Sequence, residues 1–280
     1  FAMIRMSGLR RQLGAGVVEA PPDGLTPAEQ LAAIRRDLVP IFDQAMACWR
    51  EDLEPKLRQV GIRILSYAEL KGKQRRLLRR HFEREMFPVL TPLAFDPGHP
   101  FPHISNLSLN LAVVIEDPGG RRRFARLKIP GSFPRLLRIP AEERAESYET
   151  LGLDSVETTN FVWIEDAITE NLDLLFPGMH VLAAYPFRVT RDADLEIEED
   201  EASDLLESIE ESVGMRQFGS AVRLEVDKAM PRDIRDILLQ NLEIAPYLLY
   251  TVDGPIGLAH LMQLTDVNNP DLKDAPFIPY

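Results

Sequence analysis

The chain has 280 residues, of which 45% are hydrophobic and 27% are charged, and its formal net charge is −12. Its longest aliphatic run, residues 111–115, is far too short to cross a bilayer, and its single cysteine excludes an internal disulfide framework. We therefore expect a cytoplasmic protein without a transmembrane segment and without a nucleic-acid partner. The charge is uneven: residues 1–87 carry 16 Lys and Arg against 11 Asp and Glu, and residues 88–280 carry 16 against 33, which indicates two units in different surroundings.

Helical patterns fill the first sixty residues. Apolar spacing predicts an opening helix from Phe1 to Leu13. In the stretch TPAEQ, Thr26 and Glu29 stand where a capping box requires them, and they predict the start of a long amphipathic helix that reaches Trp49. A shorter helix is predicted over residues 52–60.

A brief strand, GIRIL over residues 61–65, precedes a strongly basic segment. SYAEL, residues 66–70, holds a second capping box and predicts a helix from about Tyr67 to Phe87. Seven of the fourteen residues from 71 to 84 are Lys or Arg. Because two leucines and Phe82 give this helix a side to bury, we favour a solvated basic face, with a phosphate or polyanion contact as the alternative.

The stretch HPFPHISNLSLNLAV, residues 99–113, leads into a β-hairpin. Apolar residues recur at every second position from Leu107 to Ile115, which places them on one face of a strand. The turn DPGG then leads to a return strand over residues 124–129. His99 and His103 lie four residues apart, but the prolines around them exclude the helix that would pair them, so a packing role is favoured over a metal site.

Strand and helix patterns alternate through the rest of the chain. Strands are predicted over residues 161–164, 181–189, 222–226 and 247–251, and helices over residues 167–176, 200–213, 231–242 and 257–264. Together with the hairpin, these elements predict an α+β fold in which a small N-terminal helical domain is followed by a mixed α/β domain. The order of the strands is left open.

Two charged stretches are candidates for chemistry. Residues 192–211 hold eleven acids and no Lys or Arg. A cation site is conceivable there, but an apolar stripe at helical spacing favours a solvated helix face. Just before this run, Arg188 and Arg191 flank two residues at the end of a predicted strand. They either form salt bridges to the acidic run, which we favour, or clamp a phosphate.

Recognised catalytic motifs are missing from the sequence. We find no GxxxxGK[ST], GxGxxG, HExxH, GxSxG or CxxC and no kinase HRD or DFG, and the five histidines show no ligand spacing. Cys48, beside Trp49 in a helical setting, is expected to be a core thiol rather than a nucleophile. On the residues alone, we expect no catalytic residue and no metal ligand in this chain.

Several stretches, taken together and in order, resemble type 1 polyphosphate kinases. They are FAMIRMSGLRRQL and DGLTPAEQL near the beginning, then FPVLTPLAFDPGHPFPHISNLSLNLAV, FARLKIPGSFPRLLRIP, LFPGM and FRVTRDADLE. The resemblance implies a small helical N-terminal domain, a mixed α/β "head" domain and two phospholipase-D-like C-terminal domains. Residues 1–60 would be the first of these, and residues 61–280 would be the head domain with an extended linker.

The resemblance also implies a reaction. The family transfers the γ-phosphate of ATP reversibly to inorganic polyphosphate, leaving ADP, with Mg²⁺ and through a phosphohistidine. In the family the phosphohistidine and the magnesium-binding residues belong to the C-terminal domains. Phe1 matches the last letter of the family motif NLDEF, so the asparagine that contacts the nucleotide falls before this sequence. We therefore carry over no catalytic residue and no Mg²⁺ ligand, and we expect these 280 residues alone to be inactive.

A supporting role remains. Arg5 follows the NLDEF position, and Arg188 and Arg191 belong to the family-like FRVTR; we expect these three to line the path of the phosphates of ATP or polyphosphate. The head domain implies a homodimer or homotetramer, and peripheral attachment to a membrane is left open. The alternative is a non-catalytic polyanion-binding or dimerisation module, in which the basic residues 71–84 would hold the polyanion.

Overall fold

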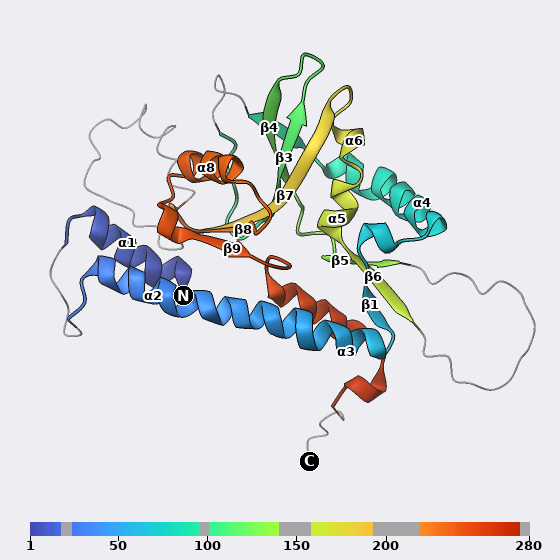
Figure 1. Cartoon of the computed structure of the whole chain (residues 1–280), viewed down its shortest axis with the longest axis horizontal. Coiled ribbons are helices and arrows are strands. Elements are labelled where there is room, and N and C mark those ends of the chain that lie inside the picture. Colours follow the sequence, from blue (N-terminus) through green and yellow to red (C-terminus); the bar gives the residue numbers. More distant parts are fainter. Residues whose placement is uncertain (18–23, 96–100, 140–157, 193–218, 275–280) are drawn as a thin grey trace, which may run out of the picture.

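The computed structural model describes residues 1–17, 24–95, 101–139, 158–192 and 219–274. Helices form the beginning of the chain, and two β-sheets with shorter helices around them form the remainder (Figure 1). The predicted fold class, a helical N-terminal region followed by a mixed α/β region, is confirmed. Among the described residues, no helix has both the length and the apolar composition needed to cross a membrane.

The N-terminal region consists of two antiparallel helical arms. A π-helical turn, η1 (Ala2–Met6), continues as α1 (Ser7–Gly14), and α2 (Pro27–Cys48) packs beside it. The two helices predicted after α1 are joined, because α2 runs through the π-helical turn η2 (Trp49–Leu53) into α3 (Glu54–Gln59) and forms one long rod in Figure 1.

The capping box that opens α2 is confirmed. The backbone N–H of Thr26 donates to Glu29 Oε2 at 2.8 Å, and Thr26 Oγ1 accepts from the N–H of Glu29 at 3.4 Å. The prediction that Cys48 is a core thiol is wrong, because its side chain is exposed. Met46 and Trp49, three residues apart, form the buried face of the helix here, and Cys48 points away from it.

The larger sheet has six strands in the order β2-β4-β3-β7-β8-β9, and all neighbours are antiparallel except β8 and β9. The bounds are β2 (Pro92–Phe95), β3 (Leu109–Glu116), β4 (Arg122–Lys128), β7 (His180–Arg191), β8 (Ala221–Asp227) and β9 (Leu249–Val252). The predicted hairpin is confirmed as β3 and β4, with Val113 opposite Ala125. Asp117 closes its turn, because its Oδ1 accepts the N–H groups of Gly119 and Arg121 at 2.9 and 3.0 Å.

A smaller sheet has the order β1-β6-β5. Its strands are β1 (Ile62–Ile64), β5 (Leu136–Ile139) and β6 (Thr159–Trp163), with β1 parallel to β6. The strand predicted in GIRIL is confirmed, but β2 and β5 were not predicted from the sequence.

Short helices complete the described chain. They are η3 (Tyr67–Glu69), α4 (Gly72–His81), η4 (Phe82–Met86), η5 (Phe87–Val89), α5 (Ile164–Thr169), α6 (Leu172–Leu175), α8 (Arg232–Asn241), η6 (Pro246–Leu248), η7 (Leu258–Asp266) and η8 (Pro270–Leu272). The prediction of one helix from Tyr67 to Phe87 is wrong in detail: the Ser66–Glu69 box closes only a 3₁₀ turn, since Leu70 is extended, and α4 begins at Gly72. The helix predicted over 167–176 is two helices, and the one predicted over 200–213 lies outside the described residues.

Two main hydrophobic cores cover the two faces of the six-stranded sheet, as the alternation of its strands requires. The first contains Leu111 of β3 together with Phe82 and residues of the smaller sheet. The second contains Ala112 of β3 and Phe187 of β7, packed against α1, α2 and α8. The N-terminal arms therefore cover one face of the larger sheet directly.

Candidate functional site

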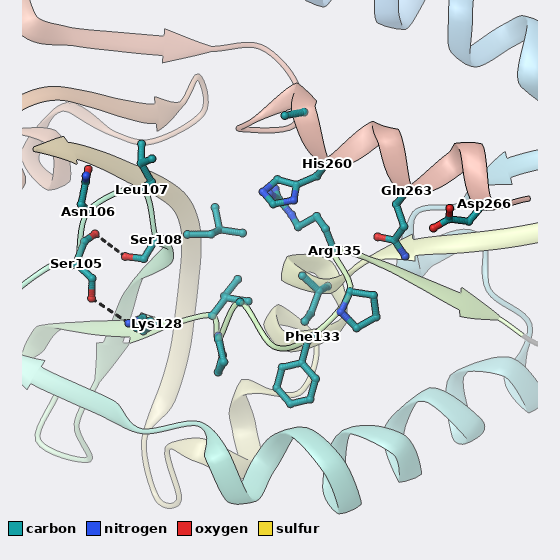
Figure 2. Close-up of a pocket in the computed structure, with 17 residues that line it drawn as sticks. Ser105, Asn106, Leu107, Ser108, Lys128, Phe133, Arg135, His260, Gln263 and Asp266 are labelled. Carbon is teal, nitrogen blue, oxygen red and sulfur yellow. Dashed lines mark hydrogen bonds between the residues drawn. The ribbon is translucent and has the colours of Figure 1, made fainter. Parts of the chain in front are cut away.

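A large cavity lies at one end of the six-stranded sheet, between the β3–β4 hairpin and η7 (Figure 2). Its volume is about 710 Å³. The polar residues that line it are Ser105, Asn106, Ser108, Lys128, Arg135, His260, Gln263 and Asp266. Lys128 and the serines stand on one side of the space in Figure 2, and His260, Gln263 and Asp266 stand on the other. The cavity is thus polar on two facing walls, with more cationic than anionic side chains.

The first wall is the loop that leads into β3. Lys128 Nζ donates to Ser105 Oγ at 2.9 Å, and Ser108 Oγ donates to the Ser105 carbonyl at 2.8 Å. Leu107 between them has a φ of 56°, an unusual left-handed conformation for a leucine. These bonds hold the loop in one shape and place the Lys128 ammonium at the rim of the cavity.

The opposite wall is anchored by a buried ion pair. Arg135 binds Glu165 through two hydrogen bonds, one of them from Nε to Oε2 at 2.7 Å, and its Nη1 donates to the Ile256 carbonyl at 2.9 Å. The guanidinium also lies over the indole of Trp163, 5.2 Å from the centre of the ring. Arg135 therefore ties the segment before η7 to β5 and α5.

Gln263 of η7 completes this wall. Its Oε1 accepts the Leu136 N–H at 3.0 Å, and its Nε2 donates to the Leu136 carbonyl at 2.7 Å. His260, one turn earlier, has its pKa lowered by burial first and then by the charges of Arg135 and Arg188. The imidazole is thus kept neutral beside two guanidinium groups.

Arg188 lies on the same side of the larger sheet as the first core. It binds Glu225 of β8 with two hydrogen bonds, Nε to Oε2 at 2.7 Å and Nη2 to Oε1 at 2.9 Å. Arg223 shares this carboxylate at 2.8 Å. Arg188 therefore forms a salt bridge, but to a carboxylate of the neighbouring strand and not to the acidic run that the sequence suggested. Residues 193–211 of that run lie outside the described residues.

Gly257 approaches Arg188 closely, and this gives a direct test of the packing there. The glycine has a φ of +83°, and a Cβ added to it would lie 2.7 Å from Arg188 Nη1. Gly257→Ala should therefore lower the free energy of unfolding by about 1–2 kcal/mol from the left-handed backbone alone, and more from the displaced guanidinium. Urea denaturation measures the loss. Gly131→Ala is the control, since nothing lies within 4 Å of its added Cβ, and an equal loss in both variants would contradict this account.

Arg191 and Arg5 lie on the other side of the larger sheet, with the N-terminal arms. Arg191 Nε donates to the Ile104 carbonyl at 2.7 Å, and its Nη1 donates to the Gly219 carbonyl at 2.9 Å. Arg5 is exposed on η1, a turn that packs on β7 and β8, and its Nη2 donates to Gln30 Oε1 at 2.5 Å. Of the three predicted residues, Arg5 and Arg191 share a side of the sheet, and Arg188 faces the opposite side.

Sequence reasoning did not single out two further cations near Arg191. Arg126 of β4 is only 6% exposed, and its Nε donates to Asn110 Oδ1 at 2.8 Å. Its pKa is lowered by burial, as is that of Arg191. The pKa of His103 is lowered by burial and then by the charges of Arg191, Arg126 and Lys128. In the sequence, only the alternation of Arg126 and Lys128 along one predicted strand could have indicated these cations.

The described residues offer no metal centre. No group of three or more His, Cys, Asp or Glu among them lies close enough together to hold an ion. His99, the possible partner of His103, lies outside the described residues. We therefore assign none of the expected Mg²⁺ chemistry to the part of the chain that the structure describes.

Comparisons with known proteins find similarity to one family over nearly the whole length of this chain. Residues 1–65 match the family described as polyphosphate kinase N-terminal domain, and residues 73–264 match the polyphosphate kinase middle domain. The chain is 44% identical to polyphosphate kinase 1 of Chlorobaculum tepidum over 281 residues, which cover all of this chain and 39% of that protein. It is 48% identical to a polyphosphate kinase of Aphanizomenon baltica over 275 residues, covering 97% of this chain and 69% of that protein.

The fold has a counterpart among solved structures. The crystal structure of polyphosphate kinase from Porphyromonas gingivalis matches 99% of this chain and 37% of its own chain with a TM-score of 0.73 at 23% sequence identity. The present sequence thus spans 37–39% of the length of several proteins that it resembles. Because residues 1–65 and 73–264 match two domains of one family in order, the chain belongs to the polyphosphate kinases.

Proposed function

We propose that this chain is the N-terminal and head region of an enzyme that reversibly transfers the γ-phosphate of ATP to inorganic polyphosphate. The observation that carries the proposal is the ordered match of residues 1–65 and 73–264 to the two family domains. We place the boundary between the two regions at residue 60, just before β1 joins the smaller sheet.

The chemistry itself is assigned to the remainder of the protein. The phosphohistidine and the Mg²⁺ ligands belong, in this proposal, to C-terminal domains that the present sequence does not span. The contribution of this chain is support: it positions cations for phosphate groups and provides a surface for a homodimer or homotetramer in the cytoplasm. Such a division is physically reasonable, because phosphoryl transfer depends mainly on positioning and on neutralising charge.

Arg5, Arg188 and Arg191 are the residues that we propose to line the phosphate path. The contacts of Arg191 support this role. Among the described residues, its guanidinium bonds only to carbonyl oxygens and forms no ion pair with a carboxylate. Arg188 is held rigidly by Glu225. Arg5 is the most accessible of the three and makes one bond to Gln30.

Charge reversal tests this role in the full-length protein. Arg5→Glu and Arg191→Glu should each lower kcat/KM for polyphosphate synthesis from ATP about 10–100-fold, as expected for the loss of a hydrogen bond to a charged group. Arg188→Lys, which keeps a charge beside Glu225 but not the paired geometry, should lower it less. Arg63→Glu on β1 is the matched control and should keep the activity of the unmodified enzyme.

Two results would refute these assignments separately. Unchanged kinetics in the Arg5 and Arg191 variants would remove those residues from the phosphate path. Absence of any ATP-dependent polyphosphate synthesis by the unmodified full-length protein would refute the proposed function itself and would favour the non-catalytic module.

A further inference from the structure

Four basic side chains from three separate segments meet at one end of the larger sheet. Arg126 and Lys128 lie on the same face of β4, Arg191 ends β7, and His103 precedes β3. Two hydrogen bonds hold them together: Arg191 Nε donates to the carbonyl of Ile104, the residue after His103, at 2.7 Å, and Lys128 Nζ donates to Ser105 Oγ, two residues after His103, at 2.9 Å. We call these four residues the basic cluster. Like charges repel, so bringing them together is unfavourable unless an anion is bound between them.

Arg126 is the decisive member of the cluster. Only two arginines of the described chain are less than a tenth exposed, Arg126 and Arg135. Arg135 is held by the carboxylate of Glu165 with two hydrogen bonds, as a buried guanidinium requires. Arg126 bonds to a neutral amide, Asn110, and forms no ion pair with any described carboxylate. A buried arginine without a counter-ion is costly, and an anionic ligand would supply the missing charge.

The cluster is open to a ligand. Lys128 and His103 are exposed, and Arg191 is half-buried. Lys128 also lines the cavity, whose volume of about 710 Å³ is large enough for several linked groups. The one carboxylate among the described lining residues, Asp266, stands on the opposite wall (Figure 2). An anion that enters the cavity beside Lys128 is therefore close to cationic and neutral donor groups and away from the carboxylate of Asp266.

We propose that the basic cluster binds successive phosphate groups of linear polyphosphate, with one group at Arg126 and Arg191 and the chain continuing past Lys128 into the cavity. This inference rests on the proposed function for the choice of polyphosphate among phosphate-bearing anions. Arginine suits such a site because its planar donors match phosphate oxygens in pairs, and lysine suits the exposed end as a mobile point charge. The binding is electrostatic, so it weakens as salt is added.

Hydrogen exchange of the full-length protein locates the site without relying on catalysis. Sodium tripolyphosphate should slow the exchange of backbone amides in residues 101–110 and 122–128 at least threefold. Lys128→Glu should raise the concentration needed for half of this protection at least tenfold. Arg80→Glu makes the same charge change on the exposed basic face of α4 and should leave that concentration unchanged. If Arg80→Glu abolishes protection and Lys128→Glu does not, α4 binds the polyanion and the proposal is wrong.

Arg126→Gln separates a binding role from a structural one. Glutamine keeps a donor for Asn110 but removes the charge. The variant should lose the tripolyphosphate protection while its melting temperature without phosphate stays equal to or above that of the unmodified protein. A protein that binds as before would overturn the proposal. If Arg126→Gln fails to fold, Lys128→Glu, which changes an exposed side chain, decides the question alone.

Two further ligands distinguish the source of the phosphate. Orthophosphate should protect the same residues only at concentrations at least tenfold above tripolyphosphate, because it reaches fewer of the cations. Stronger protection by a non-hydrolysable ATP analogue than by tripolyphosphate would assign the cluster to a nucleotide and overturn the polyphosphate assignment. Protection without any polyphosphate synthesis by the unmodified enzyme would support the site and refute the proposed function, so the two failures are distinguishable.

Discussion

Replacing Arg135 by methionine should lower the free energy of unfolding by about 3–5 kcal/mol, the largest loss that we expect from a single substitution in this chain. The change leaves Glu165 buried and charged without its partner, and it removes the donor to the Ile256 carbonyl. Equilibrium urea denaturation at neutral pH measures the loss. The midpoint of unfolding should occur at a lower urea concentration, while the slope of the unfolding free energy against urea concentration stays unchanged.

Two variants show whether the uncompensated charge is the cause. Lys56→Met removes an exposed ion pair with Asp52 on the helical rod and should change stability by less than about 1 kcal/mol. The double variant Arg135→Met with Glu165→Leu removes both charges and should recover part of the loss. A loss below 1 kcal/mol in Arg135→Met would show that this pair does not hold the cavity wall in place.

Asp166 should make the folded protein less stable as the pH rises. Asp166 lines a second cavity of about 420 Å³ together with Trp163, Tyr185 and Asp227. Burial, followed by the charge of Glu165, raises the pKa of Asp166 from 3.8 to about 7. The folded state therefore holds a proton that the unfolded state releases, and stability falls between about pH 4 and pH 7, by about 4 kcal/mol over the whole window.

Asp166→Asn should abolish this fall and should make the protein more stable than the unmodified form at pH 8. Urea denaturation at pH 5, 6, 7 and 8 measures both effects. Asp253→Asn is the control of opposite sign, because hydrogen bonds from Arg50 and Lys228 lower the pKa of Asp253 and favour its charged form. That variant should be less stable at neutral pH. Parallel pH profiles for the Asp166 variant and the unmodified protein would contradict the prediction.

The elements that the sequence predicted well are those fixed by neighbouring residues. The capping box of Thr26 and Glu29 and the turn at Asp117 each satisfy their bonds within four positions, so local spacing was sufficient. The pairing of β1 with β6 joins Ile62 to Thr159, and no local pattern encodes it. β5 was missed for the same reason, since its pairing with β6 and with Gln263 depends on distant segments.

The candidate site was predicted only in part. Arg188 and Arg191 stood out because they lie in a family-like stretch, but alternation along a strand does not say what covers each face. η1 and the N-terminal arms cover the face of Arg191, and Glu225 occupies the face of Arg188. In the sequence, Arg126 and Lys128 only alternate with apolar residues along a predicted strand. Only the burial of Arg126 distinguishes it, and that burial depends on the packing of segments far apart in the chain.

The amide of Gln263 has a consequence for solubility. β5 is the outer strand of the smaller sheet, and an outer strand offers unpaired backbone groups on which another chain can assemble. At Leu136 both of those groups are taken, because one side chain imitates the peptide unit of a neighbouring strand. The sheet is thereby protected at this point against edge-to-edge aggregation by a single residue of a distant helix.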